Sequence, residues 1–430
     1  MATNRRNVKM VSSWGITAAS CSLADVQAAI ATANAGDKVI VPAGSATWDD
    51  QLVVNKGVAI IGAGEGQTNI TTSYDGSSYL QQAHYLICYN VTSASDAPFF
   101  RFSGFSIDHQ SACGLFGLFA MSATPRDKIR LDHLTITNCR LFCLLYGPVY
   151  GVGDNLDITK DSPAILMEQR SLNDTIWNNH TYTFGTTDNF YFEDCEFNNV
   201  EIIMNSGWGG RYAYRHNTVS IGMGSFATWD LHGNMGPGMS HGQMGCEIYE
   251  NTIYSNDYTV RTIDIRGGKS LLYNNELTGA GSYGAVIREE YDDGGNLPYH
   301  ASDGLPQHIW DTYYWGNTRN GSRMPVDESV PTLDYGDTDC GSWGVTQGCH
   351  KGVVPTRNVH FWEQGASFDG SSGVGVGLKA ARPETCTTGV GYWATDESKL
   401  YRATATNTWT EYYTPLAYPH PYRSDSDIGD

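Results

Sequence analysis

The sequence predicts an all-β fold, a solenoid in which the chain winds through stacked coils, with one helix near its N-terminus. A short motif is repeated, because Thr-Trp-Asp-Leu-His-Gly at 228–233 returns as Thr-Ile-Asp-Ile-Arg-Gly at 262–267. Similar strand endings recur along the chain, at 139–141, 195–197, 217–219, 251–253, 275–277 and 317–319. The shortest spacings between successive endings are 22 and 24 residues. Periods of this length are typical of solenoids, and insertions explain the longer spacings.

The composition agrees with many short strands joined by tight turns. The 430 residues include 48 Gly and 26 Tyr, and 40% of them are hydrophobic, which favours strands and turns over helices or disorder. With 27 basic and 46 acidic residues the net charge is −19. We therefore expect neither nucleic acid nor an anionic membrane as a partner. A polyanionic substrate would need a local basic patch or a bridging cation.

The N-terminal elements can be taken in order. Residues 1–22 are expected to form an arm, and residues 23–34 have apolar side chains at helical spacing. Alternating strands follow at 36–44, 51–64 and 68–74. The arm has no apolar core of signal-peptide length, and no segment is apolar for long enough to span a membrane. We expect either a leader that has been removed or a route without one, as in a phage particle.

The opening of the chain resembles a known family. ASCSLADVQAAIATANAGDKVIVPAGSATW at 19–48, followed by KGVAIIGAG at 56–64, is similar to the start of pectate-lyase-like proteins. The resemblance implies a right-handed parallel β-helix whose open end is covered by a capping helix at 23–34. GRYAYRHNTV at 210–219 and RGGKSLLYNNE at 266–276 resemble core motifs of bacterial and phage-associated β-helix proteins. The superfamily includes lyases, hydrolases, epimerases and inert fibres, so the resemblance implies the fold rather than one reaction.

The β-helix is expected to span residues 23–320. Insertions fall at 145–187, 233–245 and 290–310, and solenoid insertions are often loops on the binding face. Asparagines at the turns, Asn217, Asn251 and Asn275, are expected to stack in a structural ladder. Residues 321–430 are predicted to form irregular Gly-rich loops, flexible at 370–377. A region of aromatic strands at 391–423 would follow and pack on the helix.

The ten cysteines do not have metal-site spacing. Cys340 and Cys349 bracket a Gly-rich loop and are a candidate disulfide, and Cys139 and Cys143 are a weaker candidate. The other six are expected to be small apolar core residues.

Aligning the coils predicts a charged patch on one outer face. EIIMNS at 201–206, TWDLHG at 228–233, TIDIRG at 262–267 and AVIRE at 285–289 are aligned in this order. Side chains alternate along a strand, and adjacent strands lie about 4.8 Å apart. One outward column then contains Asn205, His232, Arg266 and Arg288, and its neighbour contains Ile203, Asp230, Asp264 and Val286. Ile202, Met204 and their equivalents would point inward.

This patch has the groups that β-elimination on a uronic-acid polysaccharide needs: a base, a cation for the carboxylate and an acid. His232 is the natural base near neutral pH. Arg266 or Lys269 would neutralise the carboxylate, or act as base with a depressed pKa. Asp230 and Asp264 are alternatively the acid pair of a glycoside hydrolase, of retaining type at this spacing. The alternative without chemistry is a surface ion-pair ladder.

Further candidates border the same patch. Trp208 would stack on a sugar ring, and Arg288 and Asn205 would bind substrate groups. Arg215, Tyr249 and Tyr273 form another outward column, either a sugar-binding wall or packing beneath a loop. The acidic run 289–293 has oxygen ligands for Ca²⁺ but no known calcium-loop spacing. A Ca²⁺ site and a solvated loop are therefore both open, and no other cofactor is indicated.

Three hypotheses follow for function. The first is an extracellular polysaccharide lyase or depolymerase, with a hydrolase as the second enzymatic choice. The second is a virion protein, such as a homotrimeric tail spike, that binds or degrades glycans. The third is a non-catalytic adhesive or structural solenoid. In each, the expected location is extracellular or on the virion surface, and the expected partner is a glycan.

Overall fold

The computed structural model describes residues 15–76, 82–93, 96–110, 113–120, 125–159, 167–170, 182–207, 209–222, 227–235, 242–255, 261–279, 283–288, 291–292, 309–327 and 355–424. Among these, no helix is both long and apolar enough to cross a membrane.

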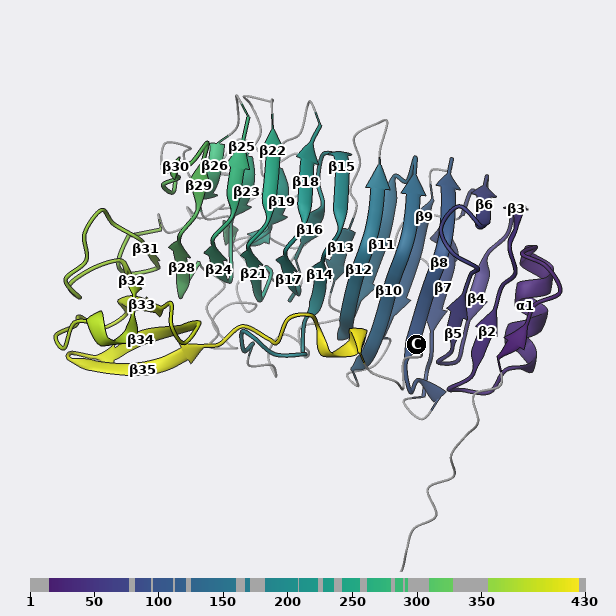
Figure 1. Cartoon of the computed structure of the whole chain (residues 1–430), viewed down its shortest axis with the longest axis horizontal. Helices are drawn as coiled ribbons and strands as arrows, with labels where there is room; N and C mark the ends of the chain where they lie inside the picture. Colours follow the sequence, from purple (N-terminus) through teal and green to yellow (C-terminus); the bar gives the residue numbers. More distant parts are fainter. Residues whose placement is uncertain are drawn as a thin grey trace, which may run out of the picture.

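One helix closes the N-terminal end of the fold (Figure 1). This helix, α1, spans Leu23–Thr32, and the Ser22 hydroxyl caps it by accepting a hydrogen bond from the Asp25 amide at 3.2 Å. Its apolar side, with Val26 and Ile30, is buried. The helix ends two residues before the predicted limit. Strand β1 (Ile16–Thr17) pairs with the first coil, so the end of the expected arm belongs to the solenoid.

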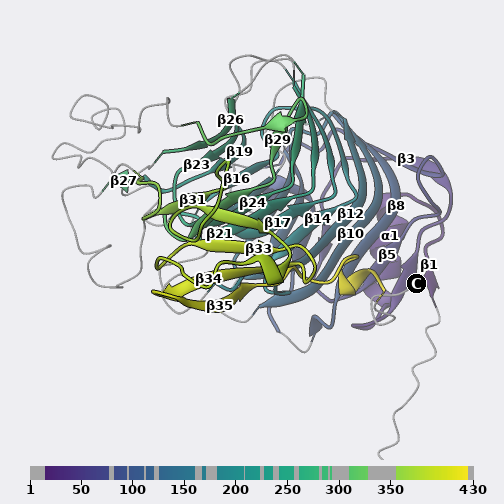
Figure 2. The same ribbon diagram turned by 60° about the vertical axis from the view of Figure 1, so that its left-hand side comes forward.

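The chain then winds in coils through three sheet faces, and the strands within each face run parallel to one another (Figures 1 and 2). Face 1 contains β1, β2 (Lys38–Ile40), β5 (Ala59–Ile61), β8 (Phe100–His109), β10 (Arg126–Thr137), β12 (Val149–Thr159), β14 (Phe190–Glu193), β17 (Arg211–Arg215), β21 (Gly245–Tyr249), β24 (Lys269–Tyr273), β28 (Thr312–Trp315) and β31 (Phe361–Glu363). Face 2 contains β3 (Gly44–Trp48), β6 (Thr68–Thr72), the second halves of β8, β10 and β12, β15 (Glu196–Val200), β18 (Thr218–Ile221), β22 (Thr252–Ser255), β25 (Glu276–Thr278) and β29 (Thr318–Arg319). Face 3 contains β4 (Leu52–Val54), β7 (Tyr85–Asn90), β9 (Gly114–Phe119), β11 (Leu141–Tyr146), β13 (Met167–Arg170), β16 (Met204–Ser206), β19 (Ala227–Leu231), β23 (Arg261–Ile265) and β26 (Tyr283–Ile287). The predicted right-handed parallel β-helix with an N-terminal capping helix is confirmed.

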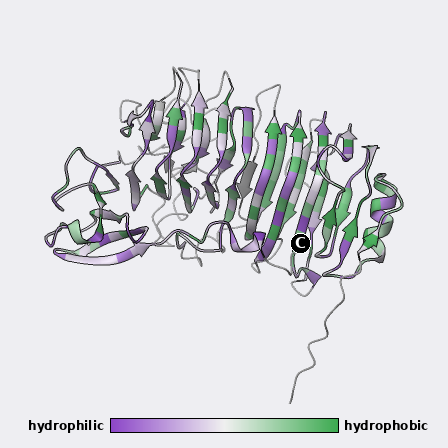
Figure 3. Cartoon of the chain, viewed as in Figure 1, coloured by the Kyte–Doolittle hydropathy of each residue, from purple (hydrophilic) through white to green (hydrophobic). Residues whose placement is uncertain are grey.

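The core is formed by the side chains at every second position of a strand, which point inward. On face 1 one inward column runs through Ile60, Phe102, Leu131, Phe192 and Tyr214 in register, and each of these side chains is fully buried. Aromatic rings stack along this column, with Phe192 and Tyr214 at a centroid distance of 5.0 Å. Apolar and polar bands therefore alternate along the strands in Figure 3.

A ladder of asparagines connects the coils at the turn between faces 1 and 2. Asn217 Nδ2 donates to Asn251 Oδ1 at 3.0 Å, Asn251 to Asn275 at 2.9 Å, and Asn275 to Asn317 at 2.9 Å. The predicted structural role of the first three is confirmed, and Asn317 extends the ladder by one coil.

The region beyond residue 320 is more regular than expected. Strand β31 pairs with β28 and continues the coil stack. A four-stranded sheet follows, of β32 (Val374–Gly377), β33 (Gly391–Ala394), β34 (Lys399–Ala405) and β35 (Thr408–Tyr413). The expectation of a flexible loop at 370–377 is thus wrong, since 374–377 form a strand.

Residues 414–424, which we call the C-terminal strap, return along face 1 toward β10 and β12 (Figures 1 and 2). Arg215 donates to the carbonyl oxygens of Leu416 at 2.6 Å and Ala417 at 2.9 Å. Arg130 donates to the carbonyl of Arg423 at 3.1 Å. The strap therefore covers the outer side of face 1 across several coils.

All eight cysteines in the described part of the chain are free and buried. Cys139 and Cys143 are among them, so the disulfide considered for this pair is not formed. The six predicted core cysteines are buried as expected. Cys340 and Cys349 lie outside the described residues.

Candidate functional site

The repeated hexapeptides lie in register on face 3, as predicted. Strand β19 pairs with β23 so that Asp230 lies opposite Asp264 and Leu231 opposite Ile265. Strand β23 pairs with β26 so that Asp264 lies opposite Val286. Trp229, Leu231 and Ile265 point into the core. The polar residues between them therefore project from the outer side of the sheet.

The predicted position of Asn205 is wrong. Strand β16 pairs with β19 two residues out of the expected register, so Asn205 lies opposite Asp230 and not beside His232. Ile203, expected to point outward, is a fully buried core residue. A slide by two residues keeps the alternation of the strand itself, so the apolar pattern could not exclude it.

Asp230, His232 and Arg266 form one contacting cluster. Arg266 forms an ion pair with the Asp230 carboxylate, and its Nη2 lies 2.8 Å from His232 Nδ1. His232 Nε2 lies 3.2 Å from Asp230 Oδ2. The same Nη2 lies 2.9 Å from His232 Nε2, so Arg266 contacts both ring nitrogens. The ring of His232 is therefore held between the guanidinium and the carboxylate.

A second ion-pair group lies on the next coils. Asp264 accepts from Arg288 Nε at 2.8 Å and from Arg261 Nη1 at 3.0 Å. Asp230 pairs with Arg266, and Asp264 with Arg288, so each carboxylate binds the arginine of the following coil. This pairing removes the repulsion expected from placing Arg266 beside Arg288.

The whole patch is buried, whereas a solvated ladder would be open. Asp264 is 0% exposed, Arg288 1%, Arg266 3%, Asp230 6% and His232 8%. Burial disfavours the charged form of Asp230, but the guanidinium of Arg266 and the contact with His232 outweigh it and hold the pKa of Asp230 well below its ordinary value. Asp230 is therefore a fixed anion that orients His232 and Arg266.

Lys269 does not belong to this patch. The Gly267–Gly268 turn, with Gly268 at φ +70°, carries the chain to face 1, where Lys269 begins β24. Lys269 Nζ donates to the Tyr182 carbonyl at 2.5 Å and lies 5.0–5.2 Å from the rings of Tyr182, Phe184 and Trp310. Burial lowers the pKa of Lys269 to about 8. The predicted catalytic role beside Arg266 is therefore excluded by position.

Tyr249 and Tyr273 are packing residues in this structure. Their rings stack at 4.6 Å, and Tyr273 stacks on Trp315 at 4.4 Å. Tyr413 at the end of β35 hydrogen-bonds Tyr273 at 3.1 Å. Because they are only 2% and 1% exposed, neither ring is open to a sugar. Their role is therefore packing and not sugar binding.

Two short segments flank the cluster. Asn234–Met235 (β20), just after His232, pairs in parallel with Tyr291–Asp292 (β27), shortly after Arg288. Trp208 and most of the acidic run 289–293 lie outside the described residues. Among the residues that are described, no group of three or more His, Cys, Asp or Glu side chains could hold a metal ion.

A second charged column lies on face 1, where three acidic residues that were not predicted extend the predicted column of Arg215, Tyr249 and Tyr273. Asp132, Asp154, Glu193 and Arg215 lie opposite one another on successive coils. The three carboxylates pair with arginines that include Arg101, Arg130 and Arg423 of the strap. The signal was present in the sequence as a polar residue just before each turn. The partners that the strap contributes are distant in sequence, so the structural role of this column could not be predicted.

No protein-family model matches this chain, and no match was found among curated proteins. An alginate lyase from Paenibacillus sp. str. FPU-7 is similar in structure, with a TM-score of 0.43 and 11% identity, over 74% of this chain and 99% of that one. A Geobacillus virus E2 protein, ORF18, has a TM-score of 0.32 and 13% identity over 92% of this chain and 86% of that one. A PL6 family alginate lyase, AlyGC, has a TM-score of 0.35 and 11% identity over 97% of this chain and 58% of that one.

Proposed function

We propose that this protein acts on a carboxylated polysaccharide by β-elimination, with His232 as the base and Arg266 as the group that binds the sugar carboxylate. The observation that supports this most is the contact of His232 with both Asp230 and Arg266 in one outward cluster. Histidine is the side chain suited to proton transfer near neutral pH.

The contacts suggest how substrate would activate the base. The guanidinium of Arg266 lies within 2.9 Å of both ring nitrogens of His232. A sugar carboxylate that binds Arg266 competes for this guanidinium and draws it away from the ring. The neutral ring then takes the C5 proton, the C4–O bond breaks, a C4–C5 double bond forms, and the leaving oxygen takes up a proton from water. Asp230 stabilises the resulting imidazolium.

The same geometry favours a lyase over the retaining hydrolase. A retaining hydrolase needs one carboxylic acid that keeps its proton. The pKa of Asp230 is held low by Arg266 and His232, and Asp264 binds two arginines with no exposed surface. Neither carboxylate is arranged to donate a proton to a glycosidic oxygen.

A non-catalytic adhesive or structural role is the second candidate, and the burial of the charged patch favours it. Each charged group of the patch contacts an opposite charge, and His232 is the most exposed member at 8%. Removing one partner of a buried ion pair destabilises a protein, so such a network also has a purely structural use.

The deciding experiment is a panel of uronic-acid polysaccharides assayed for the ultraviolet absorbance of the new double bond. His232→Gln should reduce activity by about 10²-fold or more, the usual contribution of a general base. His133→Gln is the matched control, because His133 also contacts an aspartate, with Nδ1 2.7 Å from Asp132 Oδ2, on another face. Equal activity in the two variants would exclude His232 as the base, and no release from any glycan would favour the structural alternative.

We also propose an extracellular or virion-surface location, where such glycans are met. A tail spike would be a homotrimer, whereas a secreted lyase would be a monomer. The molar mass measured by light scattering, together with a search for the chain in purified phage particles, distinguishes these two arrangements.

A further inference from the structure

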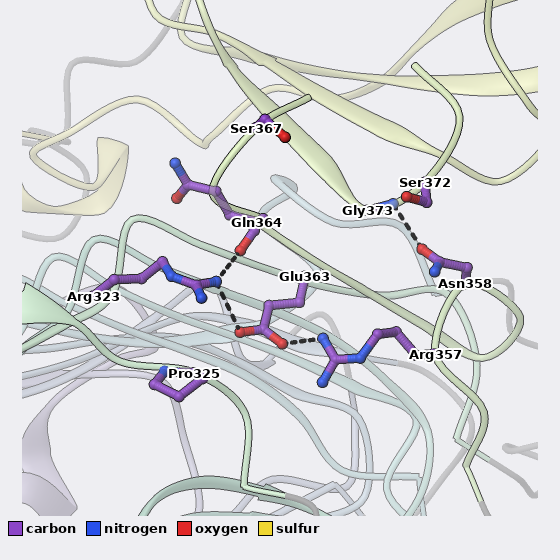
Figure 4. Close-up of a pocket in the computed structure, with 10 residues that line it drawn as sticks. Arg323, Pro325, Arg357, Asn358, Glu363, Gln364, Ser367, Ser372 and Gly373 are labelled. Atoms are coloured by element: carbon purple, nitrogen blue, oxygen red, sulfur yellow. Dashed lines mark hydrogen bonds and ion pairs between the residues drawn. The ribbon is translucent and has the colours of Figure 1, made fainter. Parts of the chain in front are cut away.

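A hollow of about 340 Å³ lies at the C-terminal end of the coil stack (Figure 4). It is formed by β30 (Ser322–Arg323), the end of β31 and the segment 365–373. Its lining is polar, with guanidinium groups, amides and hydroxyls from Arg323, Arg357, Asn358, Gln364, Ser367 and Ser372 around one carboxylate, Glu363. No residue of the hollow belongs to the cluster of Asp230.

Glu363 occupies the last position of an inward column. It lies opposite Tyr314, which lies opposite Leu272, so a carboxylate follows where earlier coils have apolar side chains. Its side chain is 4% exposed, and Oε1 accepts a hydrogen bond from the Val326 amide at 3.2 Å. A charge buried at this depth needs a cation beside it.

Two arginines line the hollow beside Glu363. Arg357 forms an ion pair with Glu363, and Arg323 Nη1 lies 3.5 Å from Glu363 Oε1. The lining residues therefore include two positive side chains and one negative side chain. The side chains of Arg323 and Arg357 are 49% and 40% exposed, and both line the hollow. This local positive charge contrasts with the net charge of −19 of the whole chain.

Hydrogen bonds hold the walls of the hollow in place. Arg323 Nη1 also donates to the Gln364 carbonyl at 2.5 Å (Figure 4). The Asn358 side-chain oxygen accepts from the Gly373 amide at 2.7 Å, which joins the two sides of the rim. Preformed polar groups on fixed backbone are typical of small-ligand sites.

We propose that this hollow is a second glycan site, which binds the carboxylate of an acidic sugar residue without cleaving it. Guanidinium groups match a carboxylate in geometry and charge, and the surrounding amides and hydroxyls match the hydroxyl groups of a sugar. The proposal shares its ligand class with the proposed function but none of its residues, so each can fail without the other.

The test compares sodium D-galacturonate with D-galactose, which differ only in the carboxylate, by saturation-transfer NMR titration of the whole chain. Galacturonate should bind and galactose should not. Arg323→Gln should weaken galacturonate about tenfold, the effect of losing one charged hydrogen bond. Glu363→Gln keeps the shape and the Val326 contact while removing the competing carboxylate, so it should strengthen binding.

Other outcomes would overturn the proposal. Equal binding of galactose and galacturonate would show that the arginines do not select a carboxylate. Inorganic phosphate binding with galacturonate failing to displace it would show an anion site that does not accept a sugar. His232→Gln should leave this binding unchanged, and a loss of binding in that variant would place the ligand at the other site. Unfolding curves of the Arg323 and Glu363 variants show whether each is folded.

Discussion

Asp264 shows how much the outer side of face 3 depends on charge pairing. It has no exposed surface, yet it contacts Arg288 and Arg261. Taking a carboxylate out of water is costly, and the two guanidinium groups offset that cost. Removing the carboxylate would leave Arg288, itself 1% exposed, without this counter-charge.

We therefore expect Asp264→Asn to destabilise the fold by about 3 kcal/mol, the typical effect of breaking a buried ion pair. Denaturant unfolding followed by circular dichroism measures this value. Glu411→Gln is the control, because the ion pair of Glu411 with Lys399 at 2.8 Å is exposed and should contribute little. Equal effects of the two substitutions would show that burial of Asp264 does not matter.

The sequence predicted the positions of some of these residues correctly but not those of others. Asp230 and Asp264 could be placed side by side because two similar hexapeptides, at 228–233 and 262–267, share Thr, Asp and Gly at the same positions. Asn205 could not, because its strand has no matching polar residue and alternation allows a two-residue slide. The burial of the patch could not be predicted either. Alternation indicates the side of the sheet on which a residue lies, but not which segments cover that side.

The asparagine ladder acts at the scale of the elements. Asn251 occupies a central rung, where it accepts from Asn217 and donates to Asn275 and to the Tyr214 carbonyl. Each rung satisfies buried polar groups at the turn between two faces, and it fixes the stacking of one coil on the next.

Asn251→Ala should therefore lower the free energy of unfolding by about 2–4 kcal/mol, because several buried partners lose their bonds together. Thermal and denaturant unfolding both measure the change. Asn69→Ala is a suitable comparison, since the Asn69 amide makes an exposed bond to the Gly66 carbonyl at 3.2 Å. A similar small loss in both variants would mean that the ladder adds no stability.

Element boundaries were predictable where local chemistry marks them. Ser22 and the apolar spacing after it marked α1, and the recurring Asn turns marked the coils. Lys269 was misplaced because two glycines turn the chain onto another face within three residues of Arg266. The strand at 374–377 was missed because its partner, β33, gives it a structure that its Gly-rich sequence does not favour.

At the scale of the whole molecule, Glu247 joins three distant segments. Its carboxylate accepts from the Gly185 amide at 2.7 Å and from the Tyr413 hydroxyl at 2.7 Å, and it has no exposed surface. Burial raises the pKa of Glu247 from 4.5 to about 7, although these hydrogen bonds and the charges of Arg215 and Lys269 act in the opposite direction.

This shift predicts a pH dependence of stability. The unfolded chain loses the Glu247 proton near pH 4.5, while the folded chain keeps it to about pH 7. Between these values the unfolded state binds fewer protons, so stability falls as pH rises and stays lower above pH 7. The contribution is about 3 kcal/mol.

Glu247→Gln should remove this slope, because the amide does not titrate. The measurement is the difference in unfolding free energy between wild type and variant at pH 5 and at pH 7, which cancels the other titrating groups. A difference that is the same at both pH values would contradict the assigned proton.

The C-terminal strap gives the solenoid a property that stacking alone does not provide. In a simple stack each coil contacts only its neighbours, so the ends can fray and folding can spread from any point. Here Arg423 binds Glu193, 230 positions earlier in the chain, and the strap crosses coils that are far apart in sequence. Such contacts raise the contact order and couple the middle of the stack to its last strands. The molecule should therefore unfold as one cooperative unit, and its final step of folding should be the docking of the strap onto coils that are already assembled.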